Sequence, residues 1–426
     1  MRKLIFDKSL NASYFITFNL LFFVIICNAQ VDQQLAQKYF KEAQRLCEKD
    51  NTRLWGMSIC APMVIYDRQT KTIATSKPAP DAPRPQLLGL LNAPIKWGGE
   101  TWIAYMWIDV VNRNPRERKE LFLHEMFHGV QPQLKLGAAA GTPEHLDTKD
   151  GRYWMRLEWK ALEQTLRKSG KQRKRALSDA LAFRQARRLL FAANIEDERG
   201  QEITEGLAAY TGTKLAAEKN ADAKQSAIDL LTGAERTANE ASLVRTFAYI
   251  SGPAYCILLD EMSRNWQKLI KNTDDFGTLL SQALKLKPST DVLSTTLKYG
   301  GEQILIAEEK RDKIRQDHLN ELHKTFVEGS ILIFPGGNHS FDSRGAVSIQ
   351  GEGTIFFGPF RASGPWGKLE AEKGVLVSTD GSTRRVAAPK KIDESTYFGE
   401  GWSLKVGEGW YVNMGVNKGT YTLEKK

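Results

Sequence analysis

Residues 121–130 read Leu-Phe-Leu-His-Glu-Met-Phe-His-Gly-Val. On a helix, His124 and His128 lie one turn apart on the same face, so both imidazoles can reach one metal ion. Glu125 lies beside them and can act on a water molecule at that ion. The chain holds only six histidines, and this HExxH pattern has odds of roughly one in two hundred of arising by chance. Because every flanking residue is uncharged, we predict a metal site on a buried helix.

The residues before this stretch predict where the helix begins. Asn114, Pro115 and Glu117 provide an Asn cap, a proline in the first turn and a glutamate three residues after the cap. The preceding segment Thr101–Val111 (TWIAYMWIDVV) is rich in β-branched and aromatic residues and predicts a single strand. The chain is therefore expected to enter the helix from a strand.

Outward from this point, the sequence predicts an α+β protein in three regions. Residues 30–114 indicate a small α/β region, with a helix at 32–50 and strands at 59–66 and 72–75. Residues 115–328 are mostly helical, and residues 329–426 indicate an all-β module because they are rich in Gly, Thr, Val and aromatic residues with frequent turn signals. Further helices are expected at 152–168, 174–192, 198–217, 222–234, 240–264, 274–285 and 301–328.

Length and composition agree with this division. A chain of 426 residues is too long for one ordinary core, and two or three domains are expected. The hydrophobic fraction of 42% and the charged fraction of 26% are those of a globular protein. They exclude wholesale disorder, a collagen-like chain and a multi-span membrane protein.

The N-terminus has the layout of a secretory signal peptide. A basic start at residues 1–3 precedes an almost continuously apolar run at 14–27, and Cys27-Asn28-Ala29 offers small residues for cleavage. We expect residues 1–29 to be removed, which lowers the net charge from +10 to +8, and the mature protein to be secreted or periplasmic. A permanent membrane anchor is the alternative, but the run is shorter than the ~20 residues of a spanning helix. We therefore expect no stable membrane span after cleavage.

Three cysteines remain after that cleavage. An oxidising compartment would allow Cys47 and Cys60 to pair and would leave Cys256 as a buried free thiol in an apolar helix. No CxxC spacing exists, so a cysteine metal site or redox pair is not expected.

A later segment, Glu205-Gly206-Leu207-Ala208, provides a candidate third ligand to add to the HExxH pattern. Together they resemble the gluzincin metallopeptidases, especially the aminopeptidase N-like branch, in which a Glu followed by Gly, an apolar residue and Ala supplies the third zinc ligand. The resemblance implies a zincin-like helical core and a Zn²⁺ ion held by His124, His128 and Glu205. Rival third ligands are Glu202, Glu158 and, on a Gly- and Pro-rich segment, His145.

A third element of the resemblance is Tyr249-Ile250-Ser251-Gly252. Aminopeptidase N-like enzymes carry a Tyr-x-x-Gly segment at such a place, and its Tyr hydroxyl stabilises the tetrahedral oxyanion. The resemblance implies this role for Tyr249, with Tyr255 or Tyr210 as alternatives. The chain departs from that branch in two respects: the interval from His128 to Glu205 is far longer, and the GxMEN segment that recognises a free α-amino group is absent.

The resemblance covers residues 95–265 and implies an exported zinc metallopeptidase, with Glu125 as the proton acceptor and a peptide or protein as the substrate. If strand 101–111 is a sheet edge above the metal helix, it can pair with an extended substrate. The alternative from another class is a non-catalytic envelope binding protein that keeps a zincin-like fold and uses its β module for partner contact.

The densest run of positive charge does not indicate a nucleic-acid partner. Residues 167–175 contain six lysines and arginines but no aromatic residue and no recognisable nucleic-acid module. Gly170 within the run is expected to mark a solvated loop between two helices. We therefore expect no nucleic-acid partner.

Overall fold

The computed structural model describes residues 30–86, 88–89, 91–137, 141–238, 242–263, 265–341, 346–393, 395–415 and 419–426. The predicted signal peptide, residues 1–29, lies outside these ranges. The chain divides into two compact units, which are described separately. The first contains residues up to 141, 196–230 and 247–285, and the second contains residues 142–195, 231–246 and 286–426. The helical region expected at 115–328 is thus shared between the two units.

The first unit begins with the predicted helix and with a small mixed sheet, of which the third strand was not predicted. Helix α1 (Gln33–Asp50) precedes strands β1 (Met63–Tyr66), β2 (Ile73–Thr75), β3 (Ala93–Trp97) and β4 (Glu100–Met106). The strand order is β2-β1-β4-β3, in which β1 and β4 run parallel and the other neighbours run antiparallel. Side chains of the sheet, with Trp97 and Trp102 among them, form a small buried apolar cluster.

The strand predicted over Thr101–Val111 is wrong in its second half. Strand β4 ends at Met106, and the last five residues form the short helix α2 (Trp107–Val111). Trp107 and Val110 are both buried, and their spacing of three residues matches a helical turn rather than the alternation of a strand. The prediction failed because a buried turn of helix and a buried strand have the same apolar composition.

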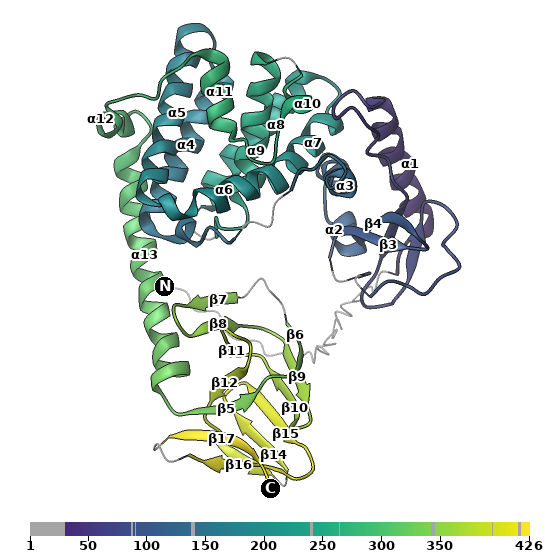
Figure 1. Ribbon diagram of the computed structural model, residues 1–426, viewed down its shortest axis with the longest axis vertical. Coiled ribbons are helices and arrows are strands. Elements are labelled where there is room, and N and C mark those ends of the chain that lie inside the picture. The colour runs from purple at the N-terminus through teal and green to yellow at the C-terminus, as the bar shows by residue number, and fades with distance from the viewer. Residues whose placement is uncertain are drawn as a thin grey trace, which may run out of the picture. The chain divides into compact units, whose positions relative to one another are not determined.

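The helices of the first unit follow the sheet. Helix α3 (Pro115–Val130) begins as predicted, with the Asn114 side chain accepting from the N–H groups of Arg116 and Glu117 and with the Glu117 side chain completing the capping box. The remaining helices are α6 (Ile195–Gln201), the π-turn η3 (Glu202–Gly206), α7 (Leu207–Ala216), α9 (Phe247–Met262), α10 (Trp266–Leu269) and α11 (Phe276–Leu284). Helix α3 packs against α7, and α7 packs against α9 (Figure 1).

Strand β4 is not the edge of the sheet, which corrects a second expectation. It lies between β1 and β3, so β3 is the outer strand on that side. Both β3 and β4 contact helix α3, and among the strands that the structure describes the outer strand beside that helix is therefore β3.

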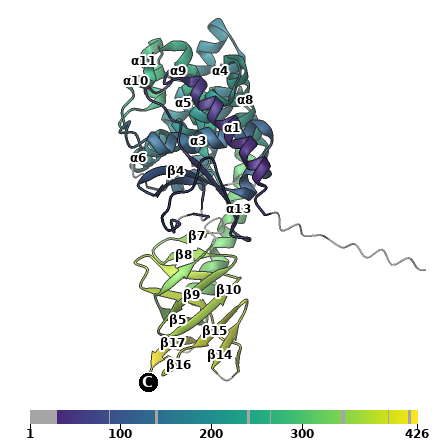
Figure 2. The same ribbon diagram turned by 90° about the vertical axis from the view of Figure 1, so that its right-hand side faces the viewer.

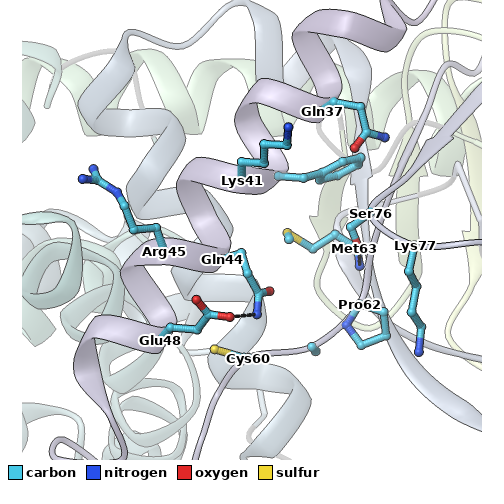
Figure 3. A pocket seen from close by; sticks show the side chains of 12 residues that line it. Gln37, Lys41, Gln44, Arg45, Glu48, Cys60, Pro62, Met63, Ser76 and Lys77 are labelled. Carbon is cyan, nitrogen blue, oxygen red and sulfur yellow. Dashed lines mark hydrogen bonds between the residues drawn. The ribbon is translucent and has the colours of Figure 1, made fainter.

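A disulfide joins α1 to the segment before β1. Cys47 and Cys60 are bonded, with Cα atoms 5.4 Å apart, which settles a pairing that the sequence left open, and Cys256 is a buried free thiol as expected. Beside the disulfide lies an open groove of about 520 Å³ (Figure 3). The groove is lined by α1, by the segment that leads into β1 and by the two residues after β2. The lining residues are Gln37, Phe40, Lys41, Gln44, Arg45, Glu48, Cys60, Ala61, Pro62, Met63, Ser76 and Lys77. No residue of the HExxH pattern lines this groove.

The second unit contains a group of helices. These are η1 (Glu144–Asp147), α4 (Lys149–Arg167), α5 (Gly170–Leu190), η2 (Ala192–Asn194), α12 (Val292–Leu297), α13 (Gly301–His323) and η4 (Lys324–Glu328), and helix α8 (Asn220–Thr237) passes from the first unit into the second. Two residues, Lys168 and Ser169, connect α4 to α5, which places the run of positive charge at a helix–loop–helix tip as predicted. Buried Glu158 of α4 pairs with Arg184 and Arg187 of α5.

The second unit ends in the predicted β module. Its strands are β5 (Ile331–Pro335), β6 (Asn338–Ser340), β7 (Ala346–Ile349), β8 (Gly353–Phe356), β9 (Phe360–Gly364), β10 (Gly367–Ala371), β11 (Val375–Ser378), β12 (Thr383–Ala387), β13 (Lys391–Asp393), β14 (Thr396–Gly399), β15 (Trp402–Val406), β16 (Trp410–Met414) and β17 (Thr420–Lys425). They form a six-stranded sheet, β13-β14-β15-β10-β9-β6, and a seven-stranded sheet, β16-β17-β5-β12-β11-β8-β7. Figure 2 shows the strands of this module. One core takes side chains from both sheets, with Leu332 and Val386 from one and Leu369 and Leu404 from the other.

The α+β class is therefore confirmed, with a small N-terminal sheet, many helices and a C-terminal β module. Within the described ranges, no helix combines the length and the apolar character that crossing a membrane requires.

Candidate metal centre

Helix α3 presents its two histidines side by side. The Nε2 atoms of His124 and His128 lie 3.0 Å apart, and His124 and Glu125 are each only 8% exposed. Tyr105 of β4 lies against the same helix and donates a 2.8 Å hydrogen bond to the carbonyl of Phe122. This bond ties the sheet to the turn of α3 that carries the two candidate histidine ligands.

The π-turn η3 brings Glu205 to these histidines. Its Oε2 atom lies 3.4 Å from Nε2 of His124 and 3.4 Å from Nε2 of His128. Within the described part of the chain, these three residues form the group of His, Cys, Asp and Glu side chains whose ligand atoms lie close enough to hold a metal ion. The structure thus brings together the three residues that the sequence singled out.

The rival third ligands lie elsewhere. Glu202 is buried at the start of η3 but does not belong to the group formed around the two histidines. Glu158 is held by two arginines in the second unit. His145 is also in the second unit, where its ring contacts Phe191 at a centroid distance of 4.7 Å.

Tyr249 of α9 is the tyrosine beside the triad. Its ring stacks on His124, with centroids 5.3 Å apart and planes inclined by 15°, and the side chain is 38% exposed. The two alternatives do not reach the site, because Tyr255 is fully buried near Phe276 and the Tyr210 hydroxyl donates to Asp260 at 2.7 Å.

A close contact between two glycines sets Glu205 beside Tyr249. Gly206 of η3 and Gly252 of α9 face each other, and a Cβ atom added to Gly252 would lie only 2.4 Å from the Gly206 Cα atom. The backbones can approach this closely because neither residue has a side chain. Gly206 directly follows Glu205 and Gly252 lies three residues after Tyr249, so the contact gives a physical reason for glycine in both segments.

Burial and charge shift the acidity of the site. Burial raises the pKa of Glu125 to about 8. Although burial opposes it, the close approach of His124 and His128 holds the pKa of the Glu205 carboxyl well below its usual value. Burial and the Glu205 carboxylate raise the pKa of Tyr249, so its hydroxyl stays protonated. A divalent cation at the triad would lower the pKa of Glu125 again through its charge.

The sequence analysis missed one residue of the site, Gln131. It caps the C-terminal end of α3 and is 4% exposed. Its Oε1 atom lies 2.8 Å from Nδ1 of His128, and its Nε2 donates 3.1 Å hydrogen bonds to the carbonyls of Ile203 and Thr204 in η3. The sequence signal was its position three residues after His128, which places both side chains on one face of the helix.

The geometry of the triad fits a metal ion. In a tetrahedral site with metal–ligand distances of about 2.0–2.2 Å, neighbouring ligand atoms lie about 3.3–3.6 Å apart. Glu205 Oε2 lies within this range, at 3.4 Å from each histidine Nε2, and the separation of 3.0 Å between the two Nε2 atoms is slightly shorter. Oε2 of Glu205 is buried and accepts no hydrogen bond of normal geometry from the described residues. A cation would satisfy this atom.

Comparison with known proteins adds no relative: no family model, no curated protein and no solved structure matches the chain. The side chains of the site itself are therefore the basis for a functional assignment.

Proposed function

We propose that the chain is an exported zinc-dependent metallopeptidase of the gluzincin type, which hydrolyses peptide bonds. The observation that carries this proposal is the convergence of His124, His128 and Glu205 on one point. Buried Glu125 follows His124 on the same helix and interacts electrostatically with His128 and Glu205. Two imidazoles and one carboxylate are the ligands of many catalytic zinc sites, in which a fourth position stays open for water or substrate.

The roles of the remaining side chains follow from their positions. Zinc at the triad would polarise the scissile carbonyl and lower the pKa of a bound water towards ~7. Glu125 accepts the proton of the attacking water and passes it to the leaving nitrogen. The protonated hydroxyl of Tyr249 donates a hydrogen bond to the carbonyl oxygen as negative charge develops there.

The substrate strand is reassigned from β4 to β3. Because β3 is the outer strand and contacts helix α3, its free edge can add an extended peptide as a further strand. The absence of the GxMEN segment means that no residue is assigned to a free α-amino group.

Export is supported by two features. The N-terminal sequence has the order of a basic, an apolar and a small-residue region expected of a signal peptide. The Cys47–Cys60 disulfide is of the kind that persists in oxidising compartments.

Metal analysis tests this proposal most directly. The purified chain is dialysed against metal-free buffer, its bound metal is identified by mass spectrometry, and it is incubated with a broad peptide library. We expect stoichiometric zinc and peptide cleavage. Glu125→Gln should keep the zinc and lose the cleavage, because the glutamine cannot accept the proton of the water.

The third ligand is tested with a matched pair in the same π-turn. Glu205→Gln should lose stoichiometric zinc, whereas Glu202→Gln should retain it, because only Glu205 approaches both histidines. Retained zinc in Glu205→Gln would remove the ligand assignment. A wild-type protein that binds no zinc and cleaves nothing in the library would instead favour a non-catalytic binding protein, and tightly bound iron would contradict the choice of zinc.

A further inference from the structure

Gln131 is positioned to act on both ligand-bearing elements of the site. It lies at the end of α3, which carries His124 and His128, and its side chain reaches the backbone of η3, which carries Glu205. It is almost fully buried and uses both ends of its amide.

The partners of Gln131 determine which way its amide points. The carbonyl oxygens of Ile203 and Thr204 can only accept hydrogen bonds, so the NH₂ group of Gln131 must face them. Its Oε1 atom then faces Nδ1 of His128 at 2.8 Å. An amide oxygen can only accept, and Nδ1 must therefore carry a hydrogen.

This arrangement fixes the tautomer of His128. With Nδ1 protonated, the neutral ring has a bare Nε2 atom, and that atom faces Nε2 of His124 at 3.0 Å and Oε2 of Glu205 at 3.4 Å. A bare imidazole nitrogen is the form that binds a metal ion. In the metal-free protein, the Nε2–H group of His124 can donate a hydrogen bond to the bare Nε2 atom of His128. This bond accounts for the short distance between the two nitrogen atoms.

The same amide supports the π-turn. Within η3, the N–H of Leu207 donates to the carbonyl of Glu202, five residues earlier, instead of the four of an α-helix. Such a shift leaves a carbonyl at the turn short of its usual partner. The Gln131 NH₂ group supplies a donor to two carbonyls of this turn, Ile203 and Thr204.

We propose that Gln131 is a positioning residue that holds His128 in its metal-binding tautomer and ties the π-turn of Glu205 to the histidine helix. The inference rests on the proposed metal site, but its first consequence, the tautomer of His128, belongs to the protein without metal.

Two substitutions separate the two contacts. Gln131→Met has similar length and removes both the acceptor for His128 and the donor for η3. Gln131→Glu keeps an acceptor for Nδ1 but cannot donate to the carbonyls of Ile203 and Thr204. Gln133→Met is the matched control, because Gln133 is exposed two residues further along the chain.

The tautomer is read from nitrogen-15 correlations of histidine-labelled, metal-free protein at alkaline pH, with the His128 signals identified by their loss in His128→Gln. We expect the Nδ1–H form in the wild type, in Gln131→Glu and in Gln133→Met. Gln131→Met should change to the Nε2–H form, which free imidazole side chains favour in water.

Metal affinity, measured by competition with a chelator, provides the second readout. Gln131→Met should bind zinc about 10- to 100-fold more weakly, which is the usual effect of losing a residue that orients a metal-binding histidine. Gln131→Glu should lie between that variant and the wild type, and Gln133→Met should match the wild type.

Two outcomes would overturn the inference. A folded Gln131→Met with the wild-type tautomer and wild-type affinity would remove the role of Gln131. If Gln131→Met does not fold, the Gln131→Glu variant decides. Loss of the Nδ1–H form of His128 in Gln131→Glu would also remove the role of Gln131. Failure of the proposed function is distinguishable, because a wild type without metal affinity would still show the tautomer pattern.

Discussion

The contact between Gly206 and Gly252 allows a sharp test of how the site is assembled. In Gly252→Ala the new Cβ atom would lie 2.4 Å from Cα, 2.8 Å from O and 2.9 Å from C of Gly206. Carbon atoms normally approach to about 3.5–4.0 Å, so α9 and η3 must separate by about 1 Å. All three obstructing atoms belong to the backbone, and no side-chain rotation can relieve the clash.

The reverse substitution is the matched control. In Gly206→Ala the new Cβ atom would lie 3.3 Å from Cα of Gly252 and 3.4 Å from the Ala248 carbonyl oxygen and from Cε2 of Phe276. These distances need a shift of only a few tenths of an ångström. The two variants add the same methyl group to the same interface and differ only in the space that receives it.

The expected magnitude follows from the cost of overpacking. The added methyl group of Gly252→Ala strains the contact by about 1–3 kcal/mol, and this strain is relieved when α9 and η3 separate. Metal binding requires the close form, and zinc affinity should therefore fall by about 5- to 150-fold at ~1.4 kcal/mol per factor of ten. Gly206→Ala should cost less than about 1 kcal/mol and stay within about fivefold of the wild type. Chelator competition measures both, and equal affinities in the two variants would refute this account.

Two further predictions concern the disulfide and the oxyanion. The double substitution Cys47→Ser and Cys60→Ser should lower the free energy of unfolding by about 3 kcal/mol, because the disulfide closes a short loop. Urea unfolding measures the change. An unchanged unfolding midpoint would count against a structural role for the disulfide. Tyr249→Phe keeps the ring on His124 but removes the hydroxyl, so zinc affinity should be unchanged while kcat falls by about 10²–10³-fold. An unchanged kcat would remove Tyr249 from the mechanism.

The parts of the molecule that the sequence predicts well are local. The cap at Asn114 and the one-turn spacing of His124 and His128 depend on residues that are neighbours in the chain, and the structure has both. The change to a β module after residue 329 is also a local change of composition, and the first strand begins at Ile331.

The parts that composition and spacing alone could not predict depend on contacts between distant segments. Glu205 and Tyr249 entered through a resemblance, and the physical reason for their motifs, the approach of two glycines, exists only in three dimensions. Gln131 was missed because its partners on η3 lie far along the chain. The end of β4 at Met106 was missed because the residues of α2 are as apolar as a strand.

The interleaving of the two units along the chain has a consequence for the order of folding. Helix α3 and the π-turn belong to one unit, but the segment between them, residues 142–195, belongs to the other. During synthesis, the histidines emerge well before Glu205, and α9 emerges later still. Closing these long loops is slow compared with forming each helix. A nascent chain that has not reached α9 would contain all three candidate ligands in its sequence but would still lack the helix against which the turn of Glu205 packs. The candidate metal centre therefore belongs to the late stages of folding of its unit.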